Sequence, residues 1–319
     1  MKKILAVLLA LSMVFALCAT ASADDQLKLG IIPMDLSVEF FTSCVEGAQA
    51  FCDQNGYKLI VFDGANDPSK QVQGVENLVA AGCKGIDLRA LDPASVMDAM
   101  YAAQDKGVFV STYPDIEGRS AVILFDDYMR GVYLAKEAAK WINEKFNGEC
   151  EVAFLIEPLN DSAMKRIDGF RDVFAEECPN AKIVKEAEGF TPDIGMASTE
   201  TILQSNPNLK VILSSNDSAA LGAFEAVTAA GKDTDDFFIG GIDGDSSALQ
   251  KIAEGTIYRA SVCAKDLVCE QAYKVMQNIA NAVLGNEYVD QVVVEEFAVT
   301  IDTVEDYLAK VPFYETKAE

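Results

Sequence analysis

The sequence predicts an α/β fold made of two similar doubly wound lobes, each built on a parallel sheet. Short apolar runs alternate with helical segments about ten times along the chain, which is the pattern of parallel strands joined by crossover helices. The alternation restarts near Glu151, so that each series has about five strands. Asp67-Pro68 and Asp92-Pro93 each place an N-cap residue before a proline at the first helical position.

The repeated unit is clearest in residues 208–231. Leu209–Leu213 is a short apolar run rich in β-branched residues, typical of a buried strand. A polar corner that includes Asn216 and Asp217 follows, and the helix after it ends at Gly231. Ligands of open α/β sheets bind outside the carboxyl ends of the strands, so this corner is expected to face a small molecule.

The other elements follow the same alternation. Strands are predicted in the first series at residues 27–32, 58–62, 85–88, 108–112 and 121–125. In the second series they are predicted at residues 151–156, 181–187, 209–213, 237–242 and 257–262, with a last strand at 292–299. No low-complexity linker separates the two series, which predicts lobes joined by several short crossings.

Residues 1–23 are predicted to be a secretory signal peptide. Lys2 and Lys3 precede the apolar run 4–16, and the small-residue site 21–23 places cleavage before Asp24. The run is shorter than the ~20 residues of a membrane-spanning anchor. Lipidation at Cys18 is the less favoured alternative, because the preceding Leu17 is large. The mature chain is therefore expected in the periplasm or at the extracellular cell surface.

Composition excludes several classes of function. The net charge of −24 becomes −26 without the two leader lysines, which disfavours binding to nucleic acid. The chain has no histidine, which removes Ser-His-Asp and Cys-His catalysis and histidine metal sites. Seven cysteines remain after cleavage, an odd number that leaves at least one thiol unpaired. No calcium-loop motif occurs, and neither a cofactor nor a metal is expected.

Six motifs then carry a family resemblance. In chain order they are Phe40-Phe41, Asp92-Pro93-Ala94-Ser95, the R-x-x-G-F match Arg166-Ile167-Asp168-Gly169-Phe170, Phe190, Ser215-Asn216-Asp217 and Gly241-Ile242-Asp243-Gly244. Taken together over the whole mature chain, they resemble the ribose-binding type of periplasmic sugar-binding protein. Such type I periplasmic binding proteins are the solute receptors of ABC transporters.

The resemblance implies a mechanism without covalent chemistry. Two lobes would close on a carbohydrate or similar small polar ligand about a hinge of three crossings, near Asp127, Ala264 and Val293. The N-terminal lobe would comprise residues 24–126 and 265–292, and the C-terminal lobe residues 127–264 and 293–319. A monomer that docks on an ABC permease is the expected form, and no enzymatic activity is expected.

The corners supply the predicted ligand-binding residues. Phe40 or Phe41 would stack on a ligand face, and Asn216 and Asp243 would bind hydroxyl groups. Arg166 would hold a ring oxygen or a carboxylate. Phe190 also belongs to the predicted set, which is completed by Ser37, Arg89 and Tyr113 at three further corners. The alternatives are structural: core packing for the aromatic rings, helix capping for Asn216, a cap or turn for Asp243, and a surface ion pair for Arg166.

Three positions depart from the ribose-binding pattern. Tyr113-Pro114 stands where those proteins carry an Asp-Arg pair, and Ser37 or Val38 where they carry an asparagine. Arg89 ends the third strand, where relatives have a small polar residue. Its alternative role is to pair with Asp87 or Asp92 on the surface. If Arg89 and Arg166 both enter the cleft, the ligand is expected to carry a negative charge.

Three other functions share parts of this pattern. A sensor that feeds a chemotaxis or signalling receptor has the same fold, and the sequence does not separate it from a transport receptor. A Rossmann enzyme would need G-x-G-x-x-G after the first strand, where Leu29-Gly30-Ile31 stands instead. A repressor effector domain would need an N-terminal DNA-binding segment, and the predicted signal peptide occupies that place.

Overall fold

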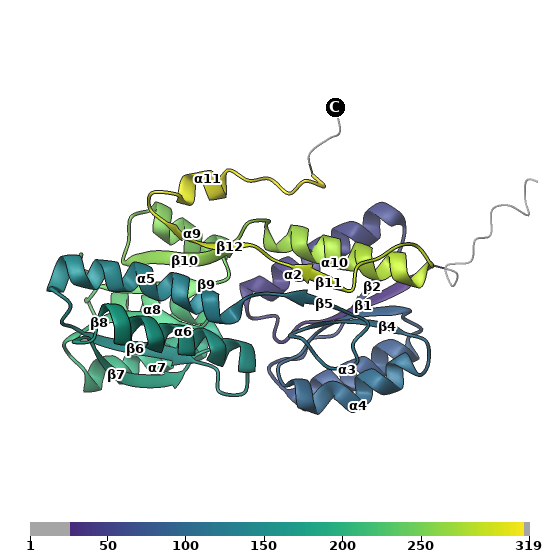
Figure 1. The fold of residues 1–319 in the computed structure, drawn as a ribbon, viewed down its shortest axis with the longest axis horizontal. Coiled ribbons are helices and arrows are strands. Elements are labelled where there is room, and N and C mark those ends of the chain that lie inside the picture. Colours follow the sequence, from purple (N-terminus) through teal and green to yellow (C-terminus); the bar gives the residue numbers. More distant parts are fainter. Residues whose placement is uncertain (1–25, 316–319) are drawn as a thin grey trace, which may run out of the picture.

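The computed structural model describes residues 26–315, so the predicted signal peptide and Cys18 lie outside the described residues. Two lobes lie side by side, each with its own six-stranded sheet and helices on both faces (Figure 1). This confirms the predicted fold class. Within residues 26–315, no helix is both long enough and apolar enough to cross a bilayer.

The N-terminal lobe has an all-parallel sheet in the order β11-β5-β4-β3-β1-β2. Its strands are β1 (Lys28–Ile32), β2 (Lys58–Val61), β3 (Gly85–Arg89), β4 (Phe109–Tyr113), β5 (Ala121–Leu124) and β11 (Gln291–Val293). On one face α2 packs against α10, and on the other α3 packs against α4 (Figure 1). These helices are α2 (Glu39–Asn55), α3 (Pro68–Ala80), α4 (Pro93–Gln104) and α10 (Val268–Val283).

The C-terminal lobe repeats this plan in the order β12-β10-β9-β8-β6-β7. Its strands are β6 (Glu151–Ile156), β7 (Lys182–Glu188), β8 (Leu209–Ser214), β9 (Phe238–Ile242), β10 (Tyr258–Ala264) and β12 (Glu296–Thr300). Its helices are α5 (Asp127–Phe146), α6 (Asp161–Glu177), α7 (Pro192–Ser205), α8 (Asp217–Ala229), α9 (Ser246–Ala253) and α11 (Val304–Leu308). Here α5 packs on α6 and α7 on α8, and β12 alone in this sheet runs antiparallel to its neighbour.

The chain passes between the lobes three times, between β5 and α5, between β10 and α10, and between β11 and β12. The prediction of one last strand at 292–299 is wrong, because this stretch forms two strands that join different sheets. Val293 pairs with Leu124 in one sheet, and Glu296 pairs with Ala264 in the other. Glu295 and Glu296 interrupt the apolar residues at this point, but they do not by themselves reveal the change of partner.

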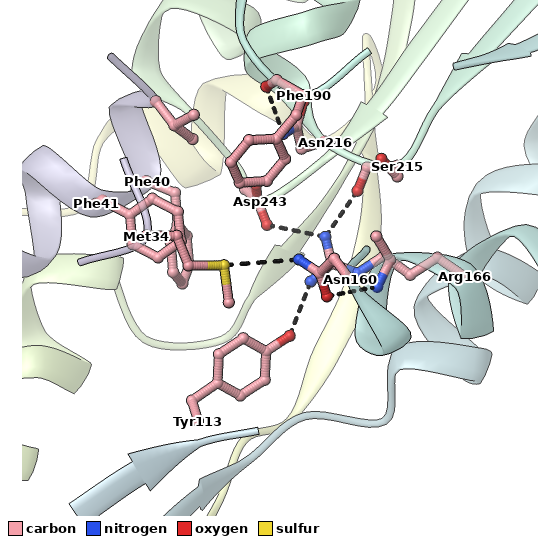
Figure 2. A pocket seen from close by; sticks show the side chains of 12 residues that line it. Met34, Phe40, Phe41, Tyr113, Asn160, Arg166, Phe190, Ser215, Asn216 and Asp243 are labelled. Carbon is pink, nitrogen blue, oxygen red and sulfur yellow. Dashed lines mark hydrogen bonds and ion pairs between the residues drawn. The ribbon is translucent and has the colours of Figure 1, made fainter. Parts of the chain in front are cut away.

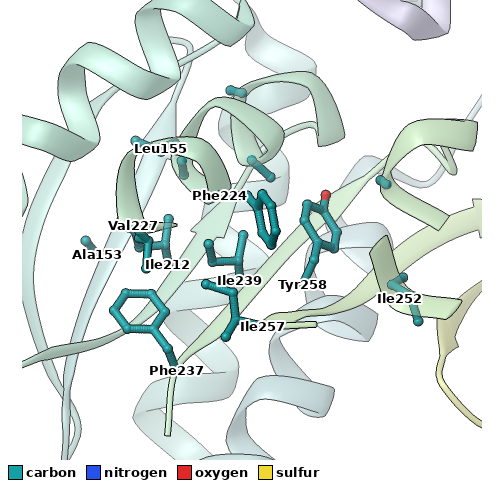
Figure 3. Packing of buried hydrophobic residues seen from close by; sticks show 14 of the residues in the cluster. Ala153, Leu155, Ile212, Phe224, Val227, Phe237, Ile239, Ile252, Ile257 and Tyr258 are labelled. Carbon is teal, nitrogen blue, oxygen red and sulfur yellow. The ribbon is translucent and has the colours of Figure 1, made fainter. Parts of the chain in front are cut away.

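The core and the caps follow the sequence pattern. Ile212 and Ile239 of the C-terminal sheet pack with Val227 of α8 in a fully buried cluster (Figure 3). Asp67 and Asp92 cap α3 and α4 by accepting hydrogen bonds from backbone N–H groups. The seven cysteines of the described residues are all reduced thiols, and most of them are buried.

Candidate functional site

A small cavity lies between the facing carboxyl ends of the two sheets (Figure 2). Its volume of about 20 Å³ is small beside the ~300 Å³ at the lower end of ligand pockets, so a ligand enters only if the walls move apart. The N-terminal lobe contributes Met34, Val38, Phe40, Phe41 and Tyr113. The C-terminal lobe contributes Asn160, Ala163, Arg166, Phe190, Ser215, Asn216 and Asp243.

The N-terminal wall is built from the connection after β1 and from the end of β4. Phe40 and Phe41 open α2, and their rings meet edge to face with centroids 5.2 Å apart. The ring of Phe41 also faces Phe190 of the other lobe at 6.4 Å. Tyr113 is 4 % exposed, and its hydroxyl lies 3.1 Å from Asp127 Oδ1. Burial is the main cause that raises the pKa of Tyr113 to about 12.

The R-x-x-G-F motif has a packing explanation. A side chain at Gly169 would meet the carbonyl oxygen of Tyr128 at 2.5 Å, and one at Gly131 would meet that of Arg166 at 2.0 Å. The two glycines therefore allow α5 and α6 to cross in backbone contact. Phe170 lies fully buried in the core below. This close crossing places Arg166 at the cavity.

Arg166 is held in place on several sides. Its Nε donates to Asp127 Oδ1 at 2.9 Å, and its Nη1 donates to the carbonyl oxygen of Ser215 at 2.7 Å. Nη2 lies 3.2 Å from the Tyr113 hydroxyl, and Nη1 lies 3.5 Å from Asp243 Oδ1. Burial works against the charge, but Tyr113, Asp127 and Asp243 together hold the pKa of Arg166 above its ordinary value. The guanidinium is therefore charged and fixed in orientation.

Asp243 sits in a backbone conformation that only a supported loop retains. Its φ is 133°, in a region that L-residues rarely adopt. The Asp217 carboxylate supports the loop, because its Oδ2 accepts from the N–H groups of Gly244 at 2.8 Å and Asp245 at 2.9 Å. Burial, followed by the charge of Asp243, raises the pKa of Asp217 to about 7.

Arg130 is a buried cation that the sequence analysis missed. Its Nε lies 2.6 Å from Glu296, and its Nη2 donates to Asp243 Oδ1 at 3.2 Å. Its Nη1 lies 3.6 Å from Asp127. Burial is the main cause that raises the pKa of Glu296 to about 7. Arg130 and Arg166 thus face three carboxyl groups, and two of these, Asp127 and Glu296, lie at crossings between the lobes.

Some of the remaining polar groups that line the cavity already make hydrogen bonds within the protein. Asn216 Oδ1 caps α8 by accepting from Ala219 N, and its amide donates to the carbonyl oxygen of Phe190 at 2.8 Å. The capping alternative is thus observed together with a place in the cavity wall. Asn160 caps α6 and directs its amide at the Met34 sulfur, 3.6 Å away in the other lobe. Ser215 Oγ is buried and has no hydrogen-bond partner.

Most of the predicted site residues meet at this cavity. Seven of the nine line it, namely Phe40, Phe41, Tyr113, Arg166, Phe190, Asn216 and Asp243. Ser37 does not; its side chain is exposed and donates to Asp35 at 2.6 Å. Arg89 does not line it either, and its Nε donates to Asp87 at 3.0 Å. This is the partner considered in the alternative role, but the pair is buried and not on the surface.

Five lining residues were not predicted. Asn160 and Ser215 lie in polar corners after β6 and β8, and their position at strand ends was the available signal. Val38 is one of the two residues considered at the position of the asparagine of relatives, and it lines the cavity in place of Ser37. Met34 and Ala163 are apolar, and an apolar residue near a helix start carries no signal that separates a cavity wall from the core.

A second contact joins the lobes outside the cavity. Glu39, the first residue of α2, accepts at Oε1 from the N–H and hydroxyl of Ser246 and from the N–H of Ser247. These groups form the N-terminus of α9 in the other lobe. The N–H of Glu39 also donates to Ser218 Oγ at 3.1 Å. Because helix N-termini favour negative charge, this contact stabilises the closed arrangement.

Comparison with known proteins identifies the family. The model of the periplasmic binding protein domain matches residues 29–287. The chain belongs to this family of periplasmic binding proteins. Its members bind solutes for transport and are not enzymes. The match covers every residue that lines the cavity, whereas strands β11 and β12 lie beyond its end.

Individual members of this family are similar to the chain in sequence and in fold. This periplasmic binding protein is 30% identical over 258 residues to the ribose import binding protein of Haemophilus influenzae, covering 80% of this chain and 85% of that one. It is 29% identical over 266 residues to the D-apiose import binding protein of Actinobacillus succinogenes, covering 82% and 83%. A solute-binding protein from Bacillus halodurans with bound myo-inositol has the same fold, with a TM-score of 0.78 at 24% identity over 91% of this chain and 100% of that one.

Proposed function

We propose that this periplasmic binding protein is the solute receptor of an ABC importer and binds a neutral sugar or similar small polyol between its lobes. The observation that carries the proposal is the cavity, which combines aromatic rings with amide, hydroxyl and carboxylate groups at the strand ends of both sheets. Aromatic faces match the C–H surface of a sugar ring, and the polar groups match its hydroxyls. Relatives named as ribose and apiose import binding proteins support this substrate class.

The charge balance of the site favours a neutral ligand over an anion. Arg166 lines the cavity, but Asp127 and Asp243 already face it at 2.9 Å and 3.5 Å. Arg89, the second cation considered for an anionic ligand, is paired with Asp87. An anion would therefore compete with carboxylates that are already in place, whereas a hydroxyl can donate to Asp243 Oδ2.

The ligand acts by favouring the closed arrangement. A molecule that contacts Phe41 on one lobe and Asp243 on the other binds more tightly when both walls approach it, so binding shifts the open–closed equilibrium. We propose lobes of residues 24–126 with 265–293 and of 127–264 with 294–319. The last boundary lies one residue later than the sequence suggested, because Val293 pairs with Leu124 in the N-terminal sheet. We also propose ligand contacts at the seven predicted residues that line the cavity. Ser37 and Arg89 remain predictions without a position in its wall.

The cellular location of the chain and its permease partner are part of the same proposal. The leader at residues 1–23 would export the chain, and cleavage before Asp24 would release it outside the cytoplasmic membrane. The mature form would work as a monomer that presents its closed lobes to an ABC permease.

A thermal-shift panel on residues 24–319 tests this function. Neutral sugars, polyols, sugar acids and nucleosides are compared at equal concentration. A neutral ligand at ~1,000 times its dissociation constant stabilises the fold by about 4 kcal/mol, and the melting temperature should rise on the order of 8 °C. A response to sugar acids alone would overturn the neutral ligand. If no carbohydrate or polyol raises the melting temperature, the proposed substrate class is wrong.

A further inference from the structure

The N-terminal wall of the cavity offers a ligand almost no hydrogen bonds. Met34, Val38, Phe40 and Phe41 present a thioether, methyl groups and two rings. The only hydroxyl on this wall belongs to Tyr113, and it is already shared between Asp127 at 3.1 Å and Arg166 at 3.2 Å. All five side chains are buried, so water does not readily reach a ligand group that faces them.

The C-terminal wall is different, because uncommitted polar atoms gather there. Ser215 is 1% exposed, and its Oγ has no partner in the structure. Asp243 binds the arginines through Oδ1, which leaves Oδ2 as an acceptor for a hydroxyl. Asn160 and Asn216 each commit one amide hydrogen and keep a second. The close-up places these groups together on one side of the cavity, opposite Met34 and Phe41 (Figure 2).

This asymmetry sets a condition on the ligand. A hydroxyl directed at Met34 or Val38 would lose its water and gain no partner, and an unpaired buried hydroxyl costs about tenfold in affinity. A hydrogen, methyl or thioalkyl group at the same position would fill the wall instead. An ordinary hexose or pentose, with hydroxyls around its whole ring, leaves at least one of them against the apolar wall.

We infer that the ligand is a sugar or related polyol with one hydroxyl-bearing edge and one deoxygenated or alkylated edge. The hydroxyl edge faces Ser215 and Asp243, and the apolar edge faces Met34 and Val38. This inference rests on the proposed function and narrows its substrate class.

Matched pairs of sugars test the inference by isothermal titration calorimetry on residues 24–319. Suitable pairs are D-galactose with D-fucose, D-glucose with 6-deoxy-D-glucose, and D-ribose with 5-deoxy-D-ribose. In the pair that binds, the deoxy sugar should bind about tenfold more tightly than its parent. Parents that bind as tightly as their deoxy partners, or more tightly, would overturn the inference and leave the proposed function standing.

A change of the apolar wall provides the second arm. Met34→Gln keeps the side-chain length and adds an amide, so the preference for the deoxy sugar should fall from about tenfold to about twofold. Met196→Gln, at an exposed position of α7, is the matched control and should keep the preference. Val38→Thr should act in the same direction if Met34→Gln fails to fold. An unchanged preference in both wall variants would overturn the inference.

These measurements distinguish a failure of the proposed function from a failure of the narrower inference about the ligand. If no carbohydrate or polyol binds the wild-type chain, the proposed function fails and the inference fails with it. If sugars bind without regard to the deoxy position, only the inference fails.

Discussion

In the N-terminal lobe the ends of β1 and β4 lead to Met34, Phe41 and Tyr113, whereas in the C-terminal lobe the equivalent ends, those of β6 and β9, lead to Asn160 and Asp243. The two sheets share one strand order, so equivalent corners of the same scaffold carry opposite chemistry. Strand order therefore fixes where a ligand binds but does not fix what each wall offers it.

The difference extends to the buried charges. Arg89 of the N-terminal lobe is paired with a single carboxylate, Asp87, away from the cavity. Arg130 joins Asp243 in the cavity wall to Glu296 and Asp127 at the crossings. Charge in one lobe thus supports the fold alone, and in the other it links the binding site to the hinge.

The largest expected effect compares these two arginines. Arg89→Met and Arg130→Met each leave a buried carboxylate unpaired, so each should lower the free energy of unfolding by about 3 to 5 kcal/mol in urea titrations. Only Arg130→Met should also weaken ligand binding, because Asp243 then loses a partner. Equal loss of affinity in both variants would show that the lobes do not differ in this way.

Asp243→Asn should weaken binding about 100-fold, which corresponds to about 2.7 kcal/mol. The substitution keeps the shape of the side chain but removes the charge that orients both arginines and accepts a ligand hydroxyl. Calorimetry measures the change, and Asp306→Asn, at an exposed position of α11, is the control. A loss of affinity of less than threefold would show that Asp243 does not contact the ligand.

Glu39→Gln tests the contact between the lobes outside the cavity. The neutral amide accepts weaker hydrogen bonds than the carboxylate from Ser246 and Ser247 at the N-terminus of α9. The free energy of lobe closure should therefore become less favourable by about 1 kcal/mol. Small-angle X-ray scattering should then show a larger radius of gyration without ligand, and affinity should fall about fivefold. Glu46→Gln, an exposed position on the same helix, should change neither quantity. If Glu39→Gln behaves like this control, the contact does not hold the lobes together.

The smallest expected effect is a pH dependence that arises in the C-terminal lobe. Burial is the main cause that raises the pKa of Glu157 from 4.5 to about 7. The folded chain therefore holds this proton more tightly than the unfolded chain between these values. The stability contributed by this carboxyl is present below pH 4.5 and is lost as the pH rises through 7.

Glu157→Gln removes this titration. It should raise the free energy of unfolding at pH 7.5 by about 1 kcal/mol and flatten its decline between pH 5 and 7.5. Urea titrations at several pH values measure both, with the exposed Glu176→Gln as control. A wild-type chain that becomes more stable as the pH rises through this range would contradict the assignment.

Local signals made most of the fold predictable. Strand composition, aspartate caps before proline and glycine stops all act within a few residues, so the sequence shows them directly. The division of residues 291–300 between two sheets depends on long-range partners. Glu295 and Glu296 interrupt the apolar residues there, but two acidic residues do not show which sheet each half joins.

The site was predictable where polar residues follow strands, as with Asn216 and Asp243. Arg130 was missed because an arginine in an amphipathic helix is normally on the surface, whereas the packing of α5 over β9, β10 and β12 buries it. Arg89 had an available signal. Asp87 and Arg89 are two residues apart on one strand and therefore share a face, which favours the ion pair that the structure has.

One calorimetric comparison tests the division between the walls most directly. The affinities of a parent sugar and its deoxy partner are measured for the wild-type chain, for Ser215→Ala and for Met34→Gln. We predict that Ser215→Ala weakens both sugars by about the same factor, because it alters the edge that they share, while Met34→Gln changes the ratio between them. A changed ratio in Ser215→Ala, together with an unchanged ratio in Met34→Gln, would contradict the account.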